Sequence, residues 1–226
     1  MRITYYGHSC FLVDTGSHKL LFDPFITPNE LASKIEISSI EADFILLSHG
    51  HEDHIADVMK VYERTKATVI STYEVIHYFQ NKGVENAQPM NHGGSWKFDF
   101  GKVKMVSAIH SSSFPDGSYA GNPAGFVVQT EGGTFYYAGD TALTMDMKLI
   151  AEQFKINFAF MPIGDNFTMD INDAVKAADF VNTDKIIGMH YDTFPYIEID
   201  HEQAKNVAAD SKKDLTLMQI GASITI

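Results

Sequence analysis

The sequence predicts one α/β domain built as a four-layer αββα sandwich, in which helices cover the outer faces of two sheets. Three observations predict this fold. Runs of β-forming residues followed by alternating strands and helices occur twice, which fits two sheets better than a doubly wound parallel sheet. The 226 residues suit one domain with a sizeable core or two tightly joined halves, and we take residues 1–226 as one domain. A composition of 45% hydrophobic and 20% charged residues is ordinary for a globular protein.

The first half of the chain opens with short β-rich runs, separated by Gly-His-Ser and Thr-Gly-Ser turns. A continuous apolar run at 43–48 indicates a buried strand, and the following segment has apolar residues at helical spacing. Gly83 ends a second helix. The predicted elements are strands 3–6, 10–14, 19–23 and 43–48, a helix 54–65, a strand 68–71 and a helix 73–82.

The second half repeats this order. The turn Glu131-Gly132-Gly133 joins two strands into a hairpin. Asp200, with Gln203 three residues later, resembles a capping box and begins the last helix. The predicted elements are strands 97–100, 103–108, 125–130 and 134–138, a helix 143–154, a strand 158–161, a helix 172–181, a strand 185–189, a helix from about residue 201, and strands 215–220 and 223–226.

The formal net charge of −12 disfavours nucleic acid and anionic membrane surfaces as partners. It does not exclude an anionic substrate, because bound metal cations invert the local field. The single cysteine, Cys10, permits no intrachain disulfide, which fits a reducing compartment. We find no signal peptide in the strand-like start and no apolar run near the roughly 18 residues of a membrane span. We therefore expect the cytoplasm.

A histidine-rich segment, Ser48-His49-Gly50-His51-Glu52-Asp53-His54, lies between a predicted strand and a predicted helix. Three imidazoles and a carboxylate this close together are useful mainly for coordinating a borderline cation such as zinc. His49 and His51 are two residues apart at a strand end, so both can point the same way. Asp53 and His54 can face a second position. The alternative is a polar loop with Asp53 as a helix cap; Glu52 is expected to point to solvent.

Three further candidate donors stand at the ends of predicted strands. His110 follows the run 103–108, Asp140 follows 134–138 and His190 follows 185–189. Each alone could be structural. Together they indicate one site assembled at an edge of the sheets, where loops held by rigid elements concentrate function.

The set His49-x-His51-x-Asp53-His54, then His110, Asp140 and His190, resembles in order and spacing the motifs of the metallo-β-lactamase superfamily. Flanking motifs resemble a family of small prokaryotic metal-dependent hydrolases related to the ascorbate-phosphate lactonase type. These motifs are Gly7-His8-Ser9-Cys10, Asp23-Pro24-Phe25, residues 122–126, Gly139-Asp140-Thr141, residues 162–169 and residues 189–195. The resemblance covers nearly the whole chain.

The resemblance implies a metallo-β-lactamase-like fold and two divalent metal ions per chain. It places one ion on His49, His51 and His110, the other on Asp53, His54 and His190, and Asp140 between them. Zinc or manganese is expected, and such donors also accept iron or nickel. An aspartate at 140, where the most studied zinc β-lactamases have cysteine, argues against β-lactam specificity. A histidine at 51, where the diiron redox branch has glutamate, argues for hydrolysis.

The expected reaction is attack by a hydroxide that bridges two cations about 3.5–4 Å apart, with the substrate oxygen polarised by the same ions. Asp53 and Asp140 are the expected catalytic carboxylates. His8, in a glycine turn, is expected at the pocket mouth, where it donates to a developing oxyanion or leaving group; the alternative is a plain turn histidine. Cys10 is expected to be a small buried residue rather than a nucleophile.

Weaker candidates surround this set. The superfamily aspartate that matches Asp23 supports the histidine loop, as partners that orient metal ligands do. Residues 111–117 are expected to form a flexible loop over the site, and His92 is expected in a loop without a role. The candidate pocket residues, which could equally be turn or cap residues, are Asp165, Asn166, Tyr191 and Thr193.

Three functions remain open. Hydrolysis of a small ester, lactone or thioester is favoured, because the compact chain has no appended domain for a large substrate. A phosphodiesterase acting on a small phosphodiester would use the same site, but the acidic balance and the lack of a basic patch count against RNA. The non-enzyme alternative is a metal-dependent metabolite-binding module. We expect a small-molecule substrate, no nucleic acid and no membrane partner; a homo-oligomer is allowed, because superfamily relatives often associate.

Overall fold

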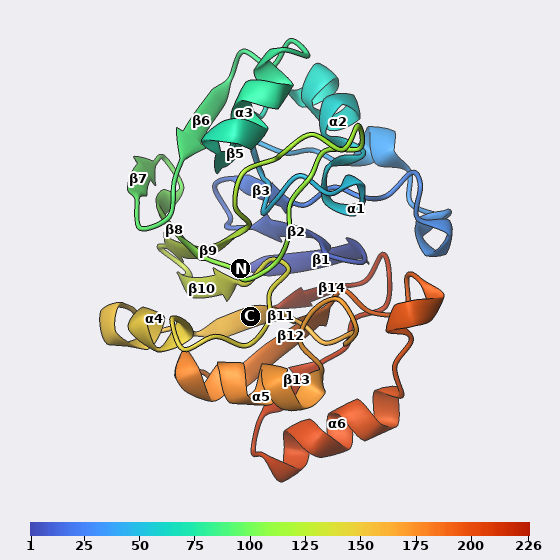
Figure 1. Cartoon of the computed structure of the whole chain (residues 1–226), viewed down its shortest axis with the longest axis vertical. Coiled ribbons are helices and arrows are strands. Elements are labelled where there is room, and N and C mark those ends of the chain that lie inside the picture. Colours follow the sequence, from blue (N-terminus) through green and yellow to red (C-terminus); the bar gives the residue numbers. More distant parts are fainter.

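Two seven-stranded mixed sheets lie face to face at the centre of the structure, a computed structural model that describes residues 1–226 (Figure 1). Three helices lie on the first sheet: α1 (Glu52–Ile55), α2 (Val58–Thr65) and α3 (Tyr73–Gln80). Three more lie on the second sheet: α4 (Met147–Gln153), α5 (Ile171–Phe180) and α6 (His201–Asp210). The predicted αββα sandwich is confirmed.

The strands of each sheet follow one another closely along the chain. The first sheet has the order β14 (Ser223–Thr225), β1 (Arg2–Gly7), β2 (Cys10–Asp14), β3 (Lys19–Phe22), β4 (Phe44–Leu46), β5 (Thr68–Thr72) and β6 (Ala87–Met90). The second has the order β13 (Asp214–Thr216), β12 (Lys185–Met189), β11 (Phe158–Pro162), β10 (Gly133–Tyr137), β9 (Ala124–Thr130), β8 (Gly101–Ser107) and β7 (Ser95–Phe98). Short 3₁₀ turns are η1 (Glu30–Ala32), η2 (Ile37–Ser39) and η3 (Pro195–Ile197).

The main core fills the space between the sheets with aromatic side chains. Phe11, Phe22, Phe135 and Phe160 are fully buried. The ring centroids of Phe11 and Phe160 are 4.7 Å apart, and those of Phe22 and Phe135 are 5.9 Å apart, so the two sheets contact each other through these rings. Burial of each such side chain contributes roughly 1.5–3 kcal/mol. This packing fixes one sheet against the other.

Both sheets change from antiparallel to parallel pairing along their width. Strands β3 to β6 are parallel to one another, and so are β10 to β13. Asp23 follows β3, His49 follows β4, Asp140 follows β10 and His190 follows β12. Ligands of open α/β sheets bind outside the carboxyl ends of parallel strands. The topology thus brings donors from distant parts of the sequence to one edge.

The helix predicted at 54–65 is wrong in extent, because two helices occupy residues 52–65. The break falls at Asp57. Its backbone N–H donates to the carbonyl of Pro24 at 3.0 Å instead of continuing α1. Its buried carboxylate accepts from Ile26 N at 2.8 Å and from Thr27 N at 2.7 Å. These contacts with a distant loop override the helical periodicity.

Several strand ends differ from the predictions. The strand predicted at 97–100 lies two residues earlier, as β7 (Ser95–Phe98). It ends at Phe98 because Phe98 pairs with Gly101 and the two residues between them form the turn. Strand β6 was missed; it contains Pro89, which lacks an N–H and suits the edge of a sheet. The strand predicted at 215–220 stops at Thr216, because the chain then crosses from the second sheet to the first.

The helix predicted at 143–154 begins only at Met147. The segment before it is held by a backbone bond from Ala142 N to Ile109 O at 3.0 Å, which ties it to the loop after β8. The capping prediction for α6 is confirmed, since Asp200 accepts from Glu202 N and Gln203 N.

The two ends of the chain meet in the first sheet. Strand β14 pairs with β1 in antiparallel register, and the amino group of Met1 donates to the carbonyl of Ile226 at 2.7 Å. None of the helices combines the length and the apolar composition that crossing a bilayer requires.

Candidate metal centre

All seven predicted donor residues lie together at the carboxyl edge of the two sheets. Four come from the loop after β4 and the start of α1, and the others follow β8, β10 and β12: His49, His51, Asp53, His54, His110, Asp140 and His190. A cavity of about 340 Å³ opens over them. It is lined by His51, Asp53, His110, Ser111, Asp140, Phe167 and His190.

His49, His51 and His110 form one group of donors. His49 Nε2 lies 2.9 Å from His51 Nδ1, and the His110 ring centroid lies 5.2 Å from each of the other two. One ring nitrogen from each lies within 4.8 Å of the others. Gly50 lies so close to Ala120 that a Cβ there would overlap it, which explains a glycine between the two histidines.

His8, Asp53, His54 and His190 form a second group. Asp53 Oδ2 lies 3.1 Å from His8 Nε2, 3.8 Å from His54 Nε2 and 3.9 Å from His190 Nε2. One ligand atom from each of the four lies within 4.8 Å of the others. Asp53 is the open member, with 24% of its side chain exposed.

Asp140 lies between the two groups. Its Oδ2 atom is 2.9 Å from His190 Nε2 and 3.3 Å from His54 Nε2, both in the second group. The same oxygen is 3.6 Å from His110 Nε2, in the first group. The Asp140 side chain is buried, so its carboxylate faces these imidazoles and not bulk water.

Asp23 holds the histidine loop from below. Its buried carboxylate accepts from Ser48 N at 2.8 Å, from Ser48 Oγ at 2.6 Å and from Tyr137 OH at 2.8 Å. It also accepts from His54 Nδ1 at 2.8 Å. A proton on Nδ1 leaves the lone pair of His54 on Nε2, which faces the site. Asp23 therefore fixes both the position and the tautomer of His54.

Three buried polar atoms of the centre have no hydrogen-bond partner: His54 Nε2, Asp140 Oδ1 and His190 Nδ1. Buried polar groups are rarely left unsatisfied in proteins. Imidazole nitrogens and carboxylate oxygens without protons are the donors that zinc and similar divalent cations take. His54 Nε2 and Asp140 Oδ1 therefore fit bound metal, and His190 faces the same centre with its Nε2, 2.9 Å from Asp140 Oδ2.

Burial lowers the pKa of His49, His51 and His110. Each of these imidazoles is therefore neutral near pH 7, and metal binding requires neutral imidazole. The first donor group is thus in the protonation state of a ligand set before any cation arrives.

The carboxylates of the centre are ionised. Burial alone would raise the pKa of Asp140, but His190 and His54 outweigh it and hold that pKa well below the usual range. Burial alone would lower the pKa of His54, but Asp140, Asp53 and Asp23 raise it well above the usual value. In the metal-free chain a second proton, on Nε2 of His54, thus balances the buried negative charge, and a cation bound at Nε2 would take the place of that proton.

His8 does not lie at the pocket mouth, contrary to the sequence prediction. Its side chain has no exposed surface, because its positive φ of 55° turns the ring inward. Its Nε2 donates to Asp53 at 3.1 Å and its Nδ1 lies 2.9 Å from Thr193 Oγ1. Burial, followed by the charge of His190, lowers the pKa of His8 to about 4. Both ring nitrogens are engaged, so His8 cannot donate to a substrate from this position.

The other predicted pocket residues lie in different places. Thr193 contacts His8 and does not line the cavity. Tyr191 is buried, and its hydroxyl donates to Met218 O at 3.5 Å. Asp165 and Asn166 are exposed and lie outside the cavity lining. Phe167, the next residue, lines the cavity; nothing in the sequence distinguishes it from a core phenylalanine.

The loop 111–117 is anchored at Phe114 and Ser112, whereas residues 115–117 are exposed. Phe114 is buried and its ring stacks on Tyr78, with the centroids 3.8 Å apart. Ser112 Oγ accepts from Gly50 N at 3.2 Å, which joins this loop to the histidine loop. Ser111 is its only residue that lines the cavity.

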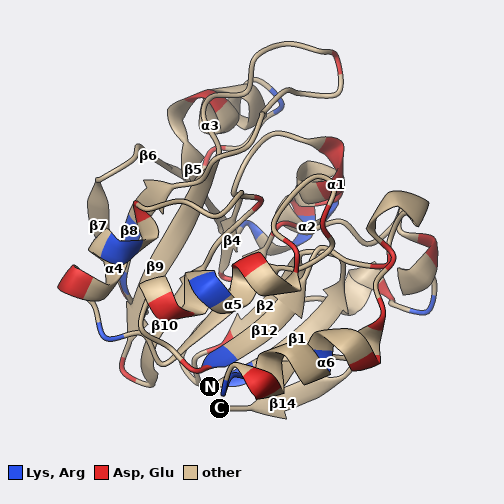
Figure 2. Ribbon diagram, turned by 60° about the horizontal axis from the view of Figure 1, so that its bottom comes forward, with Lys and Arg blue, Asp and Glu red and all other residues tan.

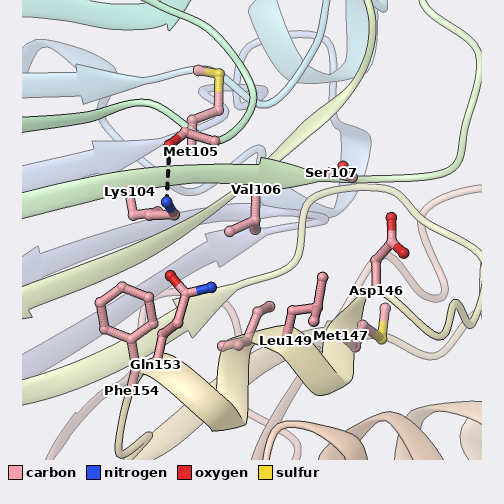
Figure 3. A pocket seen from close by; sticks show the side chains of 11 residues that line it. Lys104, Met105, Val106, Ser107, Asp146, Met147, Leu149, Gln153 and Phe154 are labelled. Atoms are coloured by element: carbon pink, nitrogen blue, oxygen red, sulfur yellow. Dashed lines mark hydrogen bonds between the residues drawn. The ribbon is translucent and has the colours of Figure 1, made fainter.

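A second hollow of about 170 Å³ lies between β8 and α4 (Figure 3). Val106, Leu149 and Phe154 make its walls largely apolar, and Lys104 donates to the carbonyl of Gly93 at 2.8 Å. It contains one carboxylate, Asp146, and no histidine. It lacks the donors of a metal site, so the chemistry belongs to the strand-end cavity.

Comparison with known proteins agrees with this geometry. The family model described as "Beta-lactamase superfamily domain" matches residues 2–190. A UPF0173 metal-dependent hydrolase of Flavobacterium johnsoniae is 54% identical over 226 residues, which is 100% of both chains. A UPF0173 metal-dependent hydrolase of Bacillus subtilis is 46% identical over 207 residues, 89% of this chain and 90% of its own.

Solved structures show the same architecture. Igni18, a metallo hydrolase of Ignicoccus hospitalis, is 31% identical with a TM-score of 0.88, covering 99% of this chain and 97% of its own. An isothiocyanate hydrolase from Delia radicum gut bacteria has a TM-score of 0.80 at 14% identity, covering 100% of this chain and 99% of its own, and shows the fold alone. The chain therefore belongs to the metallo-β-lactamase superfamily, as a UPF0173 metal-dependent hydrolase.

Proposed function

We propose that this hydrolase is dinuclear and cleaves a small ester, lactone or thioester. The single observation that carries the proposal is the position of Asp140, whose Oδ2 lies within 3.6 Å of donors from both groups. His49, His51 and His110 would hold one cation and Asp53, His54 and His190 the other, with Asp140 shared. When bound, two such cations lower the pKa of a water molecule and polarise the substrate's carbonyl oxygen.

The protein's own side chains orient the candidate ligands and transfer a proton. Asp23 keeps the Nε2 lone pair of His54 directed at the site. His8 and Thr193 hold Asp53 in place from the buried side. Asp53 is far more exposed than Asp140, at 24% against 2% of the side chain. Asp53 is ionised, so we assign it a relay: it accepts the proton released by the attacking water and passes it to the leaving group, because it is the carboxylate that a substrate in the cavity can reach.

The expected metals are zinc or manganese, since histidine and carboxylate donors suit both. The proposed partner is a small-molecule substrate, and the proposed location is the cytoplasm, where the buried thiol of Cys10 stays reduced.

Elemental analysis and turnover assays on the same preparations test the proposal. We expect about two metals per chain, and chelator-sensitive hydrolysis of a simple lactone or p-nitrophenyl ester in preference to bis-p-nitrophenyl phosphate. Asp140→Ala should lose nearly all hydrolysis, whereas His92→Ala, in a loop outside the cavity, should retain it.

Three outcomes would overturn parts of the proposal. One metal per active chain, or wild-type rates in Asp140→Ala, would contradict the assignment of two cations that share Asp140. Faster cleavage of bis-p-nitrophenyl phosphate than of the lactone or ester would identify a phosphodiester, and not a carboxylic ester, as the substrate class.

A further inference from the structure

We propose that the substrate carries an uncharged apolar group, alkyl or aryl, beside the scissile bond, and that Phe167 with Tyr196 forms the surface that binds it. This inference rests on the proposed ester or lactone hydrolysis and adds the class of substrate. Two exposed aromatic side chains carry it: Phe167, which lines the cavity of the metal centre, and Tyr196, which lines a neighbouring hollow and contacts Phe167.

Phe167 lines the cavity together with the donor residues, and 49% of its surface is exposed. The Tyr196 ring packs edge-on against it, with centroids 6.2 Å apart and planes at 71°. Tyr196 is 75% exposed. Large aromatic side chains left in water next to a reaction centre are typical of a binding surface for an apolar ligand group.

The position of Phe167 is fixed relative to Asp140. Asp165 and Asn166 both have positive φ, 60° and 51°, which reverses the chain and projects Phe167 outward. Asp165 N donates to Met169 O at 3.1 Å, and Met169 N donates to Thr141 O at 3.1 Å, one residue after Asp140. Non-glycine residues with positive φ cost energy and cluster at ligand-binding positions.

The position of Tyr196 is fixed relative to His190. The next residue, Ile197, is fully buried, and its carbonyl accepts from Asp192 N at 2.8 Å. Gly164 lies so close to the His190 carbonyl that a Cβ would overlap it, so the loops of the two aromatic residues pack together. Tyr196 is therefore held by the loop that begins at His190, and Phe167 by a loop bonded to Thr141, the residue after Asp140.

The loops at this edge contain no lysine or arginine. This holds for residues 3–18, 20–33, 35–59, 105–147, 156–175 and 186–204. The same loops carry exposed carboxylates, among them Glu52, Asp165 and Glu198. In Figure 2, α1, which follows the histidine loop, shows red and no blue. A phosphate or carboxylate on the substrate, away from the scissile bond, would find no cation to pair with and would meet like charge.

Three p-nitrophenyl esters of one acyl length test this inference: the hexanoate, the monoester of adipate, and the 6-(trimethylammonio)hexanoate. They differ only at the far end, which is methyl, carboxylate or trimethylammonium. We expect kcat/KM for the hexanoate to exceed that for the adipate monoester by roughly tenfold or more, because that carboxylate meets like charge. It should exceed that for the trimethylammonio ester by a smaller factor, because the nearby carboxylates and aromatic rings offset part of the cost of removing this cation from water. Equal or faster cleavage of either charged ester would overturn the inference.

Substitutions of Phe167 test whether this residue causes the preference for the hexanoate. Phe167→Ala should raise KM for the hexanoate with little change in kcat or metal content, and should raise KM for p-nitrophenyl acetate by a smaller factor, because the shorter acyl group buries less apolar surface. Phe167→Arg should reverse the preference between hexanoate and adipate. Leu149→Ala, an apolar residue of similar exposure (52%) beside the other hollow, is the matched control and should keep the preference.

The failure of this inference is distinct from failure of the proposed function. A chain that hydrolyses esters with an unchanged hexanoate preference in Phe167→Ala would overturn the binding surface and leave ester hydrolysis standing. A metal-loaded chain that cleaves no ester would overturn both. A second measurement does not depend on turnover: saturation-transfer NMR on the metal-loaded protein should detect hexanamide, and Phe167→Ala should lose most of that signal.

Discussion

At the scale of single residues, Asp23 joins the core to the metal centre. One buried carboxylate accepts four hydrogen bonds, from the histidine loop, from His54 and from Tyr137 in the opposite sheet. These bonds hold the loop after β4 over the cavity, together with those from Ala124 N to Ser48 O and from Gly50 N to Ser112 Oγ. The geometry of the ligands is therefore set partly by a residue that does not line the cavity.

Asp23→Ala should weaken both stability and metal binding. Four buried donors would lose their acceptor, so we expect the free energy of unfolding to fall by roughly 3 kcal/mol. Metal affinity should fall by about 10- to 100-fold, as is usual when the partner of a ligand is removed. Urea unfolding and metal titration would measure the two effects. Tyr137→Phe removes one donor only, and should cost about 1 kcal/mol with near-normal metal affinity; equal effects of both variants would contradict this role.

Acid should destabilise the metal-free protein over a defined range. Burial holds the pKa of His8 at about 4 and lowers that of His49, His51 and His110. The unfolded chain binds protons at these groups near pH 6.5, so the free energy of unfolding should fall as the pH drops from about 6.5 to about 4, by up to 1.4 kcal/mol per pH unit for each proton. His54 has a raised pKa, so its stabilising effect is fully present below about pH 6.5 and does not alter the dependence of the free energy of unfolding on pH in this range. Urea unfolding at pH 7 and pH 5 would show it, and His8→Gln should make the slope shallower.

At the scale of elements, the break between α1 and α2 joins the histidine segment to the loop after β3. The backbone of Asp57 and its carboxylate contact residues 24–27. The short α1 carries Asp53 and His54. Because of this break, the direction of α1, which carries the candidate ligands Asp53 and His54, is not set by α2, which packs on the sheet.

Asp57→Ala should therefore destabilise the protein by more than the loss of its ion pair with Lys60 alone would. The N–H groups of Ile26 and Thr27 would lose their acceptor, at a cost of roughly 2 kcal/mol. Lys60 pairs with Asp57 from a half-exposed position, and Lys60→Ala should cost less than about 0.5 kcal/mol. Equilibrium unfolding of both variants checks the contrast, and a cost as small for Asp57→Ala as for Lys60→Ala would show that the break is not held by this carboxylate.

Much of the fold follows from local patterns. The run at 43–48 and the capping of α6 by Asp200 were predicted from sequence, because apolar runs and caps are local signals. The candidate donors of the histidine segment were predicted from their density along the chain, and His110, Asp140 and His190 because each follows a predicted strand. The inward turn of His8 and the outward position of Phe167 were not found. Both depend on positive φ values, at His8 itself and at Asp165 and Asn166, and the sequence does not reveal which polar residues adopt them.

At the scale of the whole molecule, metal binding and folding are coupled. The donors come from loops of both sheets, so an unfolded chain cannot bring them together. Any ligand that binds only the folded state stabilises it.

Removal of metal should therefore lower Tm. A free metal concentration 100-fold above Kd adds about 2.7 kcal/mol to the free energy of unfolding, and chelation should remove this contribution. Calorimetry before and after chelation, with metal content verified on the same samples, measures the change. Asp140→Ala is the control, since it should show a smaller shift. An unchanged Tm in the wild-type protein after verified loss of metal would contradict the coupling.

The pairing of β14 with β1 has a consequence for biosynthesis. Strand β1 is the first strand to leave the ribosome and β14 is the last. Until residues 223–225 emerge, the outer edge of β1 has no partner, and unpaired strand edges on incomplete chains invite association with other chains. The first sheet can close only after the second sheet has been translated. The first sheet is thus completed after the second has been synthesised, and a nascent chain that stalls before residues 223–225 emerge is the form most in need of a chaperone.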